Sequence, residues 1–390
     1  MFNFYEFFAG GGMARTGLSQ GWRCLFANDI DEKKAVAYKI NFNGAPELKV
    51  CDVAALTLDD LPGIADLAWA SFPCQDLSLA GNRCGLGGER SGAFWPFWGL
   101  MQGLMIENRA PRLIVLENVC GALTSHGGQD FMAIADAFTQ AGYRFGAVVI
   151  DAIHFLPQSR PRLFMIGVRA DVEIPSEVKN AAPDPLWHSA AIRGRVVQFS
   201  LEARRHWIWW RLSPPPPRTT AFADLVESEP KGVDWHTSEE THRLLSMMSE
   251  ANRAKVSMAR TAGRRMVGGV YKRTRHGAQR AEVRFDDVAG CLRTPLGGSS
   301  RQTILMVEGE NIRSRLLSPR EAARLMGLPD SYRLPKKYND AYHLAGDGLA
   351  VPVIRHLAAH ILEPVLSCIE PFAASQSDIS SYPQVMEIAA

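Results

Sequence analysis

Residues 1–18 place a strand, a glycine turn and a helix in immediate succession. Residues 4–8 are mostly aromatic and predict a buried strand, and residues 13–18 have a helical pattern. The turn between them is Ala9, Gly10, Gly11 and Gly12. Glycine lets the backbone approach a ligand closely, and the N-terminus of the following helix offers unpaired N–H groups. This order predicts the start of a nucleotide-binding βαβ unit and an α/β fold.

Acidic residues end the next two predicted strands. Residues 23–27 lead to Asp29, and residues 48–51 lead to Asp52. An acidic residue about twenty positions after the glycine turn is placed to hold ribose hydroxyls, and the second carboxylate suits an adenine amino group. One such residue would be ordinary loop chemistry. The glycine turn and the two aspartates follow three consecutive strands, and this combination indicates an adenosine compound as ligand.

A proline precedes a cysteine at the end of another short apolar strand. Residues 66–70 predict that strand, and Pro73 ends it because proline cannot donate to a β-ladder. Cys74 follows, at the start of a loop rich in glycine and serine over residues 75–92. A cysteine in an intracellular protein is more often a small buried apolar residue than a catalyst, so this pair is a weak signal by itself.

Two further segments add titratable and cationic groups. The apolar strand of residues 113–119 carries Glu117, and burial at a strand end raises the pKa of a carboxyl group toward that of a general acid. Arg160 and Arg162 lie two apart on an extended segment, so their side chains point to the same side. A guanidinium can bind a phosphate or a base carbonyl, although either arginine alone could be a solvated surface charge.

Together these segments resemble, in order, the motifs of the DNA (cytosine-5)-methyltransferases. The resemblance covers about residues 1–169 and 290–366 and rests on residues 7–12, 72–75, 117–119, 158–162, 314–329 and 346–352. Met13 stands where the family has a glycine, which changes packing. Asp347 stands where it has an asparagine, which leaves the polar contact to the cofactor open.

The resemblance implies the fold and the reaction. The expected fold is α/β, with a Rossmann-like domain whose mixed, mostly parallel sheet is flanked by helices, plus a smaller, irregular target-recognition domain. The Cys74 thiolate would add to C6 of a flipped-out cytosine, and protonated Glu117 would donate to N3. Arg160 would hold the base carbonyl and stabilise the thiolate, and Arg162 would steady the catalytic loop or the base. Pro73 and Asn118 complete the expected catalytic set.

The same resemblance implies S-adenosylmethionine as methyl donor, without a metal. The residues expected to bind it are Phe8, Ala9, Gly10, Gly11, Gly12, Asp29, Ile30, Asp52, Val53, Phe72, Phe94, Asp347, Gly348 and Leu349.

A basic window separates the early motifs from the late ones. Between Arg253 and Arg301 there are twelve basic and three acidic residues, a net charge of +9, although the whole chain has only +2. Such a one-sided patch favours a polyanion partner over a merely solvated face. Together with this patch, the resemblance implies double-stranded DNA as partner. The residues expected to contact it are Gln75, Ser78, Arg83, Arg264, Arg265, Lys272, Arg273, Arg275, Arg293 and Arg301.

The expected division of the chain follows from the order of these segments. Residues 1–180 would form the catalytic and cofactor-binding domain, 181–330 the target-recognition domain, 331–370 a segment returning to the first domain, and 371–390 a flexible tail. Within the predicted target-recognition domain, four prolines at 214–217 predict a stiff connector. The tryptophans of residues 207–210 are expected to pack in the core rather than stack on bases. A helix is predicted to begin at Pro319 after the cap Ser318, and another to cover residues 350–366.

Cysteine use and hydropathy bound the setting. The seven cysteines show no Cys-x-x-Cys spacing, which favours a reducing compartment over disulfides or a metal. The start of the chain lacks a basic signal-peptide region, and no apolar run is expected to reach the length that crosses a bilayer. These features predict a cytoplasmic protein. The resemblance adds an association with the nucleoid and a monomer on DNA, and it leaves open a separate cognate restriction endonuclease.

Two other functions remain open at this point. An RNA cytosine methyltransferase is disfavoured by the long basic region and by the absence of a Thr-Cys pair. A catalytically silent DNA-binding regulator is disfavoured because Cys74, Glu117 and Arg160 are all present.

Overall fold

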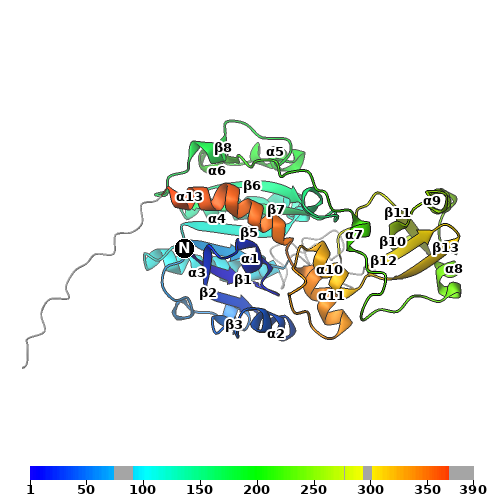
Figure 1. Ribbon diagram of the computed structural model, residues 1–390. Helices are drawn as coiled ribbons and strands as arrows, with labels where there is room; N and C mark the ends of the chain where they lie inside the picture. Colours follow the sequence, from blue (N-terminus) through cyan, green and yellow to red (C-terminus); the bar gives the residue numbers. More distant parts are fainter. Residues whose placement is uncertain (74–90, 276, 293–300, 369–390) are drawn as a thin grey trace, which may run out of the picture.

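The computed structural model describes residues 1–73, 91–275, 277–292 and 301–368, which form two lobes of unequal size (Figure 1). Cys74, Gln75, Ser78, Arg83 and Arg293 lie outside the described residues. The larger lobe holds a seven-stranded sheet in the order β3-β2-β1-β4-β5-β7-β6. Its strands are β1 (Phe2–Phe7), β2 (Trp22–Asp29), β3 (Leu48–Val50), β4 (Leu67–Ala70), β5 (Leu113–Val119), β6 (Tyr143–Asp151) and β7 (Pro161–Arg169).

The sheet is mixed and mostly parallel, as predicted. β1 to β5 pair in parallel, and β7 runs antiparallel to both of its neighbours, β5 and β6. The strand order reverses beside β1, and ligands bind such sheets at the carboxyl ends of the strands near this reversal. Because β7 runs in reverse, its first residues lie at that same edge, with Arg162 opposite Val119 of β5.

Helices cover both faces of this sheet, because the strands alternate apolar side chains between them. In β4, Leu67 and Trp69 belong to the core on one face, and Ala68 and Ala70 to the core on the other. Figure 1 shows the covering helices, which are α1 (Met13–Leu18), α12 (Val351–Leu357) and α13 (Glu363–Ser367) on the first face and α3 (Phe94–Ile106) and α4 (Gln129–Gln140) on the second.

The last described helices pack against the first segments of the chain. A Cβ atom on Gly17 of α1 would lie 2.4 Å from the Cβ atom of Ile354 in α12, so the two helices meet where a side chain is missing. Trp22 donates from Nε1 to Glu363 at 2.9 Å, and Arg355 donates from Nη1 to the Leu18 carbonyl at 2.7 Å. The far end of the chain therefore completes the core beside β1.

One helical run has the length and apolar composition of a membrane span, against the expectation from the sequence. Among the described residues, Tyr338–Ser367 is long and apolar enough to cross a bilayer by length and composition alone. However, 61% of its most apolar window is buried inside the protein. The apolar side chains therefore belong to the core of the larger lobe, which explains their density in the sequence.

The late and middle helices follow the predicted local signals. α10 (Pro319–Leu325) begins where Ser318 and Glu321 form a capping box, which confirms the predicted start. α5 (Ala190–Val196), α6 (Leu201–His206), β8 (Lys179–Asn180) and β9 (Trp209–Trp210) lie on the larger lobe, although the predicted division assigns most of them to the recognition domain. Trp207 packs 5.5 Å from Phe145, so the tryptophan cluster is part of the core, as predicted.

The smaller lobe is regular, which differs from the irregular domain expected from the sequence. An antiparallel sheet in the order β11-β10-β12-β13 packs against two helices. The central strand β12 is buried on both faces, whereas β11 alternates apolar and charged side chains, so the basic window that contains β10 and β11 shows few apolar runs. The elements are α8 (Ser238–Ser246), α9 (Glu250–Arg260), β10 (Met266–Arg275), β11 (Ala278–Arg284), β12 (Thr303–Glu308) and β13 (Asn311–Leu316).

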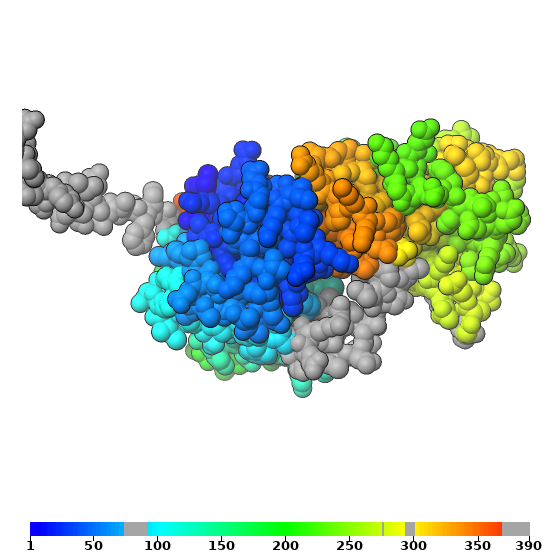
Figure 2. Space-filling model, turned by 90° about the horizontal axis from the view of Figure 1, so that it is seen from below, coloured from blue at the N-terminus to red at the C-terminus, as the bar shows by residue number. Residues whose placement is uncertain are grey.

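A buried ion pair joins the segments that enter and leave this smaller lobe. Arg315 and Glu321 pair at 2.6 Å, and neither side chain is exposed. Arg315 also donates to the Glu227 carbonyl at 2.8 Å, and Glu321 accepts from the Glu227 N–H at 2.7 Å. The segment around residues 320–350, orange in Figure 2, lies between the two lobes. It includes α10 and α11 (Tyr338–Asp347).

Candidate active site

The carboxyl ends of the parallel strands bring the predicted motifs to one edge of the sheet. β1 leads into the glycine turn, and β2 and β3 lead to Asp29 and Asp52. β4 leads to Phe72 and Pro73, and β5 carries Glu117 near its end. The parallel connections therefore bring the glycine turn, Asp29 and Asp52 to the same edge as Pro73.

The glycine turn is shaped by positive backbone angles and by a buried carboxylate. Gly10 and Gly12 have φ values of 55° and 76°, in the left-handed region that favours glycine. Asp29 is 8% exposed, and its Oδ2 accepts a hydrogen bond from the Gly10 N–H at 2.6 Å. Asp29 thus joins the end of β2 to the turn after β1.

The surrounding residues fit a nucleoside. Ile30, next to Asp29, exposes 66% of its surface although it is apolar, which suits the flat face of a base. A Cβ atom on Gly10 would meet no atom within 4 Å, so the space beside the turn is open. The exposed Asp52 accepts from the Ala54 N–H at 2.9 Å, which orients its carboxylate. These observations fit S-adenosylmethionine.

The other predicted cofactor residues line or support this edge. Ala9, Val53 and Leu349 are buried, and Gly11 and Gly12 are buried within the turn. The rings of Phe72 and Phe94 lie 5.5 Å apart in the core beneath it. Phe8 is half-buried with a φ of 56°. Asp347 and Gly348 come from the end of α11 and the turn that follows.

Glu117 faces a cation across the end of the sheet. Its Oε1 lies 3.3 Å from Arg162 Nε, and its side chain also hydrogen-bonds that of Ser71. Burial raises the pKa of Glu117, although Arg162 and Arg160 act in the opposite direction. The carboxyl group can therefore carry a proton at a higher pH than an exposed glutamate.

Asn118 connects β5 to the Pro-Cys turn. Its Nδ2 donates to the Phe72 carbonyl at 3.4 Å, and its Oδ1 accepts from the Val119 N–H at 2.9 Å. The Phe72 carbonyl belongs to the peptide unit immediately before Pro73. Asn118 thus fixes the backbone just ahead of residue 74.

Arg160 has partners different from those of Arg162. It is 2% exposed, and its Nη2 donates to the carbonyls of Gly346 and Gly348 at 2.8 and 2.7 Å. Its Nη1 donates to Cys291 Sγ at 3.4 Å, and Arg162 approaches the same sulfur at 3.9 Å. Arg162, not Arg160, is therefore the arginine in contact with Glu117.

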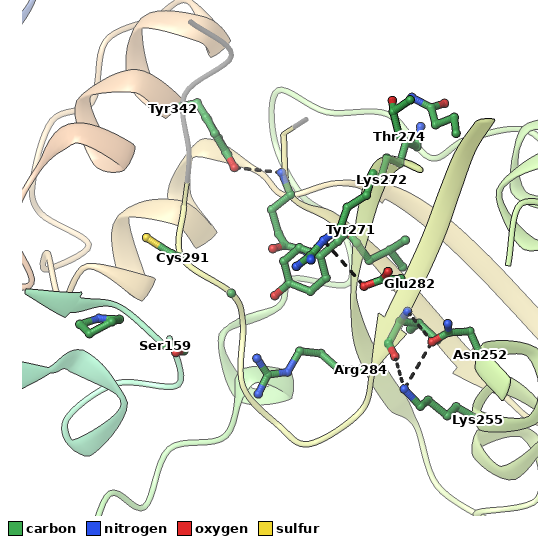
Figure 3. A pocket seen from close by; sticks show the side chains of 17 residues that line it. Ser159, Asn252, Lys255, Tyr271, Lys272, Thr274, Glu282, Arg284, Cys291 and Tyr342 are labelled. Atoms are coloured by element: carbon green, nitrogen blue, oxygen red, sulfur yellow. Dashed lines mark hydrogen bonds and ion pairs between the residues drawn. The ribbon is translucent and has the colours of Figure 1, made fainter. Parts of the chain in front are cut away.

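A cleft of about 950 Å³ opens next to these groups, between the two lobes. Figure 3 shows Ser159, Cys291 and Tyr342 on one side and residues of β10, β11 and α9 on the other. Sequence reasoning missed the members that are not part of a motif, although the alternation of the β10–β11 hairpin marks some of them. They include Asn252, Lys255, Tyr271, Gln279, Glu282, Arg284 and Cys291.

The described residues that were expected to contact DNA lie in different settings. Lys272 and Arg273 line the cleft, and Arg264 is exposed outside its lining. Arg275 ends β10. Arg265 donates to the Val226 carbonyl at 3.1 Å, and Arg301 donates to Asn339 at 2.5 Å, so both have partners within the protein.

Within the described ranges, no group of three or more metal-ligating side chains was found. The cysteines described there are free.

Comparisons with known proteins identify the family. The family model of C-5 cytosine-specific DNA methylases matches residues 2–363. The Type II methyltransferase M.NlaX of Neisseria lactamica is 26% identical over 363 residues, covering 92% of this chain and 95% of the relative. M.HhaI of Haemophilus parahaemolyticus is 24% identical over 367 residues, covering 92% and 93%.

Solved structures show the same fold. The Dnmt2 methyltransferase of S. pombe matches with a TM-score of 0.58 at 19% identity, covering 94% of this chain and 99% of that one. A putative DNA modification methyltransferase from an E. coli prophage matches with 0.57 at 17% identity, covering 94% and 100%. On the family match and its Type II relatives, the chain belongs to the C-5 cytosine-specific DNA methylases and is a DNA (cytosine-5)-methyltransferase.

Proposed function

We propose that this protein methylates C5 of a flipped-out cytosine in a specific duplex DNA sequence, through a covalent bond between Cys74 and C6. The observation that carries the proposal is the contact between Glu117 and Arg162, beside the turn that leads to Cys74. A buried carboxyl group next to a guanidinium can meet both a ring nitrogen and a carbonyl of a cytosine. The base must leave the stacked duplex to reach this edge, at a cost of a few kcal/mol.

The chemistry balances around the ring of the cytosine. The thiolate of Cys74 adds to C6 while Glu117 gives its proton to N3, so electron density moves to C5 without a full negative charge on the ring. When bound, S-adenosylmethionine would supply the electrophilic methyl group that C5 takes up and would leave as S-adenosylhomocysteine. A base then removes the C5 proton, the bond between sulfur and C6 breaks to release the thiolate, and the C5–C6 double bond returns. N3 gives its proton back to Glu117, which restores the carboxyl group.

The two arginines divide their work according to their partners. We assign to Arg162 the contact with the cytosine carbonyl, because it lies beside Glu117. Arg160 bonds the carbonyls of Gly346 and Gly348, so its role is to hold the turn that follows α11. This assignment differs from the expectation from the sequence, in which Arg160 holds the base carbonyl and stabilises the thiolate.

The residues proposed to hold S-adenosylmethionine lie at the ends of β1 to β4 and after α11. Asp29 suits the ribose hydroxyls, Asp52 the adenine amino group and Ile30 the adenine face. The glycine turn offers backbone N–H groups and open space to the rest of the molecule. No metal takes part in this proposal.

Duplex DNA is proposed to bind in the cleft between the lobes. The cleft leads from the basic β10–β11 hairpin to Cys291, which lies near Arg160 and Arg162. We further propose that the enzyme acts as a monomer in the cytoplasm, in association with the nucleoid. A cognate restriction endonuclease, if one exists, would act separately.

Covalent trapping tests the proposal. A duplex that contains the recognised site with 5-fluorocytosine at the target should form a stable adduct, because no C5 proton is present for removal. Cys74→Ser is the matched control and should form no adduct, since a hydroxyl is a far weaker nucleophile at neutral pH. Active turnover on normal DNA without an adduct on the fluorinated duplex would contradict the covalent mechanism.

A further inference from the structure

Charged side chains from two distant parts of the chain hold the turn after α11. Arg160 donates to the carbonyls of Gly346 and Gly348 at 2.8 and 2.7 Å. Between these two residues, the Oδ2 of Asp347 accepts a hydrogen bond from Lys34 Nζ at 2.9 Å. The turn is therefore fixed through its backbone by Arg160 and through its side chain by Lys34.

Lys34 is also connected to the glycine turn. It lies in the first turn of α2 (Glu32–Asn41), and its N–H donates to Asp31 Oδ1 at 3.2 Å. The Asp31 N–H donates to Asp29 Oδ1 at 2.8 Å, and Asp29 Oδ2 accepts from the Gly10 N–H at 2.6 Å. A chain of polar contacts thus leads from Asp347 through α2 to Gly10.

The neighbouring ion pair between the same two helices has a more exposed cation. Lys33 pairs with Asp340 at 3.0 Å, and its side chain is 71% exposed, compared with 21% for Lys34. The carboxylates are the reverse, with 19% exposed for Asp340 and 42% for Asp347. Burial disfavours the ammonium of Lys34, yet nearby carboxylates, Asp347 foremost, raise its pKa. Water and salt screen the less exposed ammonium of Lys34 less than that of Lys33, so the Lys34 pair should hold its geometry more firmly.

We infer that Lys34 and Asp347 form a positioning pair for S-adenosylmethionine, an inference that rests on the cofactor site proposed above. Asp347 carries a negative charge at the end of α11, and the cation of Lys34 on α2 matches it. The pair holds residues 346–349 at the edge of the cofactor site and, through Asp29, keeps the glycine turn in place. Both side chains act through the backbone that they hold.

Calorimetry on the full-length protein tests this pair. Lys34→Gln and Asp347→Asn should each weaken binding of S-adenosylmethionine and of S-adenosylhomocysteine by about three- to tenfold, the effect of a partly buried ion pair. The double variant should be no weaker than either single variant, because both remove the same interaction. Lys34→Arg keeps the cation and should retain most of the affinity.

Two controls separate positioning from other effects. Lys33→Gln and Asp340→Asn remove the exposed pair between the same helices and should leave both affinities unchanged. The unfolding temperature of each variant shows whether the fold is intact. Equal losses of affinity for both compounds support a positioning role. A direct contact of Asp347 with the sulfonium charge would instead affect S-adenosylmethionine alone, because S-adenosylhomocysteine lacks that charge.

Three results would overturn the inference. One is unchanged affinity in the Lys34 and Asp347 variants, and another is additive losses in the double variant. The third is a loss for S-adenosylmethionine alone, which would mean that Asp347 acts directly on the sulfonium charge. Wild-type protein that binds neither compound would contradict the proposed cofactor site and this inference with it, whereas normal wild-type binding with any of the three results contradicts the inference only.

Discussion

Glu117 and Glu6 are two buried carboxyl groups whose surroundings give them different roles. Glu117 lies at the open edge of the sheet with Arg162 at 3.3 Å. Glu6 lies inside the larger lobe, 1% exposed, and accepts hydrogen bonds from Tyr38 Oη at 2.8 Å and from the Arg15 N–H at 3.2 Å. Burial raises the pKa of both. Of the two, Glu117 lies at the edge of the sheet where we propose that the cytosine binds.

Glu117→Gln should nearly abolish methyl transfer. The amide keeps the size of the side chain and can donate a hydrogen bond, but it cannot release a proton to N3. The single-turnover rate should fall by about 10²- to 10⁴-fold, the usual contribution of a general acid. Binding of S-adenosylhomocysteine should stay unchanged. A rate within a few-fold of wild type would remove Glu117 from the proposed mechanism.

Glu6→Gln should stabilise the protein above neutral pH. Burial raises the pKa of Glu6 from 4.5 to about 7, so the unfolded chain ionises this group at a lower pH than the folded protein does. The free energy of unfolding should therefore fall as the pH rises from 4.5 to 7, by roughly 3 kcal/mol from this group. The advantage of Glu6→Gln over wild type in urea unfolding should grow across that range and then level off. A constant difference at every pH would contradict this assignment.

Sequence spacing predicts which residues gather at the sheet edge but not all of their partners. The motif order places Asp29, Asp52 and Glu117 there because parallel strands share their carboxyl ends. It does not distinguish Arg160 from Arg162, since alternation puts both on one side. Their partners differ because Gly346 and Gly348 return from a distant part of the chain.

The β10–β11 hairpin illustrates the same limit at the scale of an element. Tyr271 pairs with Glu282 across the ladder, and Val270 and Val283 form the next pair, on the opposite face and in the core of the smaller lobe. All four residues contribute to the lining of the cleft. The composition of the basic window predicts a polyanion partner but hides this alternation. Composition alone therefore does not predict the regular sheet of the smaller lobe, because most of the charge in β10 and β11 lies on one face of the hairpin.

Substitutions in this hairpin should change the salt dependence of DNA binding. Lys272→Gln and Arg273→Gln should each lower the slope of log affinity against log salt concentration by about 0.9, if each contacts one phosphate. Arg265→Gln should have a smaller effect, because Arg265 is bonded to the Val226 carbonyl. Arg205→Gln removes the same charge from α6 on the other lobe and serves as control. Identical slopes for all four variants would exclude the cleft as the DNA site.

At the scale of the whole molecule, the two ends of the described chain depend on each other. α1 and α12 pack together without a side chain at Gly17, and Trp22 and Arg355 add hydrogen bonds across the same contact. The smaller lobe lies between the early and late motifs in the sequence. The chain therefore leaves the larger lobe, forms the smaller lobe and returns, which brings the late motif of residues 346–352 beside the early ones. The resemblance implied this return of the chain, but the contacts that fix it involve residues outside the motifs.

A pair of glycine substitutions tests this packing. Gly17→Ala should destabilise the protein by about 1–3 kcal/mol, because the new Cβ atom would overlap Ile354. Gly99→Ala in α3 is the matched control, since a Cβ atom there meets no atom within 4 Å. It should stabilise the protein by about 0.5–1 kcal/mol through helix propensity. Urea unfolding measures both, and a stabilising Gly17→Ala would show that α1 and α12 can separate at no cost.

The buried pair of Arg315 and Glu321 has a consequence for engineering. Both side chains hydrogen-bond the backbone of Glu227. The segment that enters the smaller lobe at Glu227 is therefore bound to the segment that leaves it at Arg315 and Glu321. A recognition module transplanted from a relative between residues 228 and 314 would keep this connection. A graft that ends beyond Arg315 would leave Glu321 buried without its cation, a change that typically costs about 3–5 kcal/mol. The pair thus marks where a chimaera with altered sequence preference should be joined.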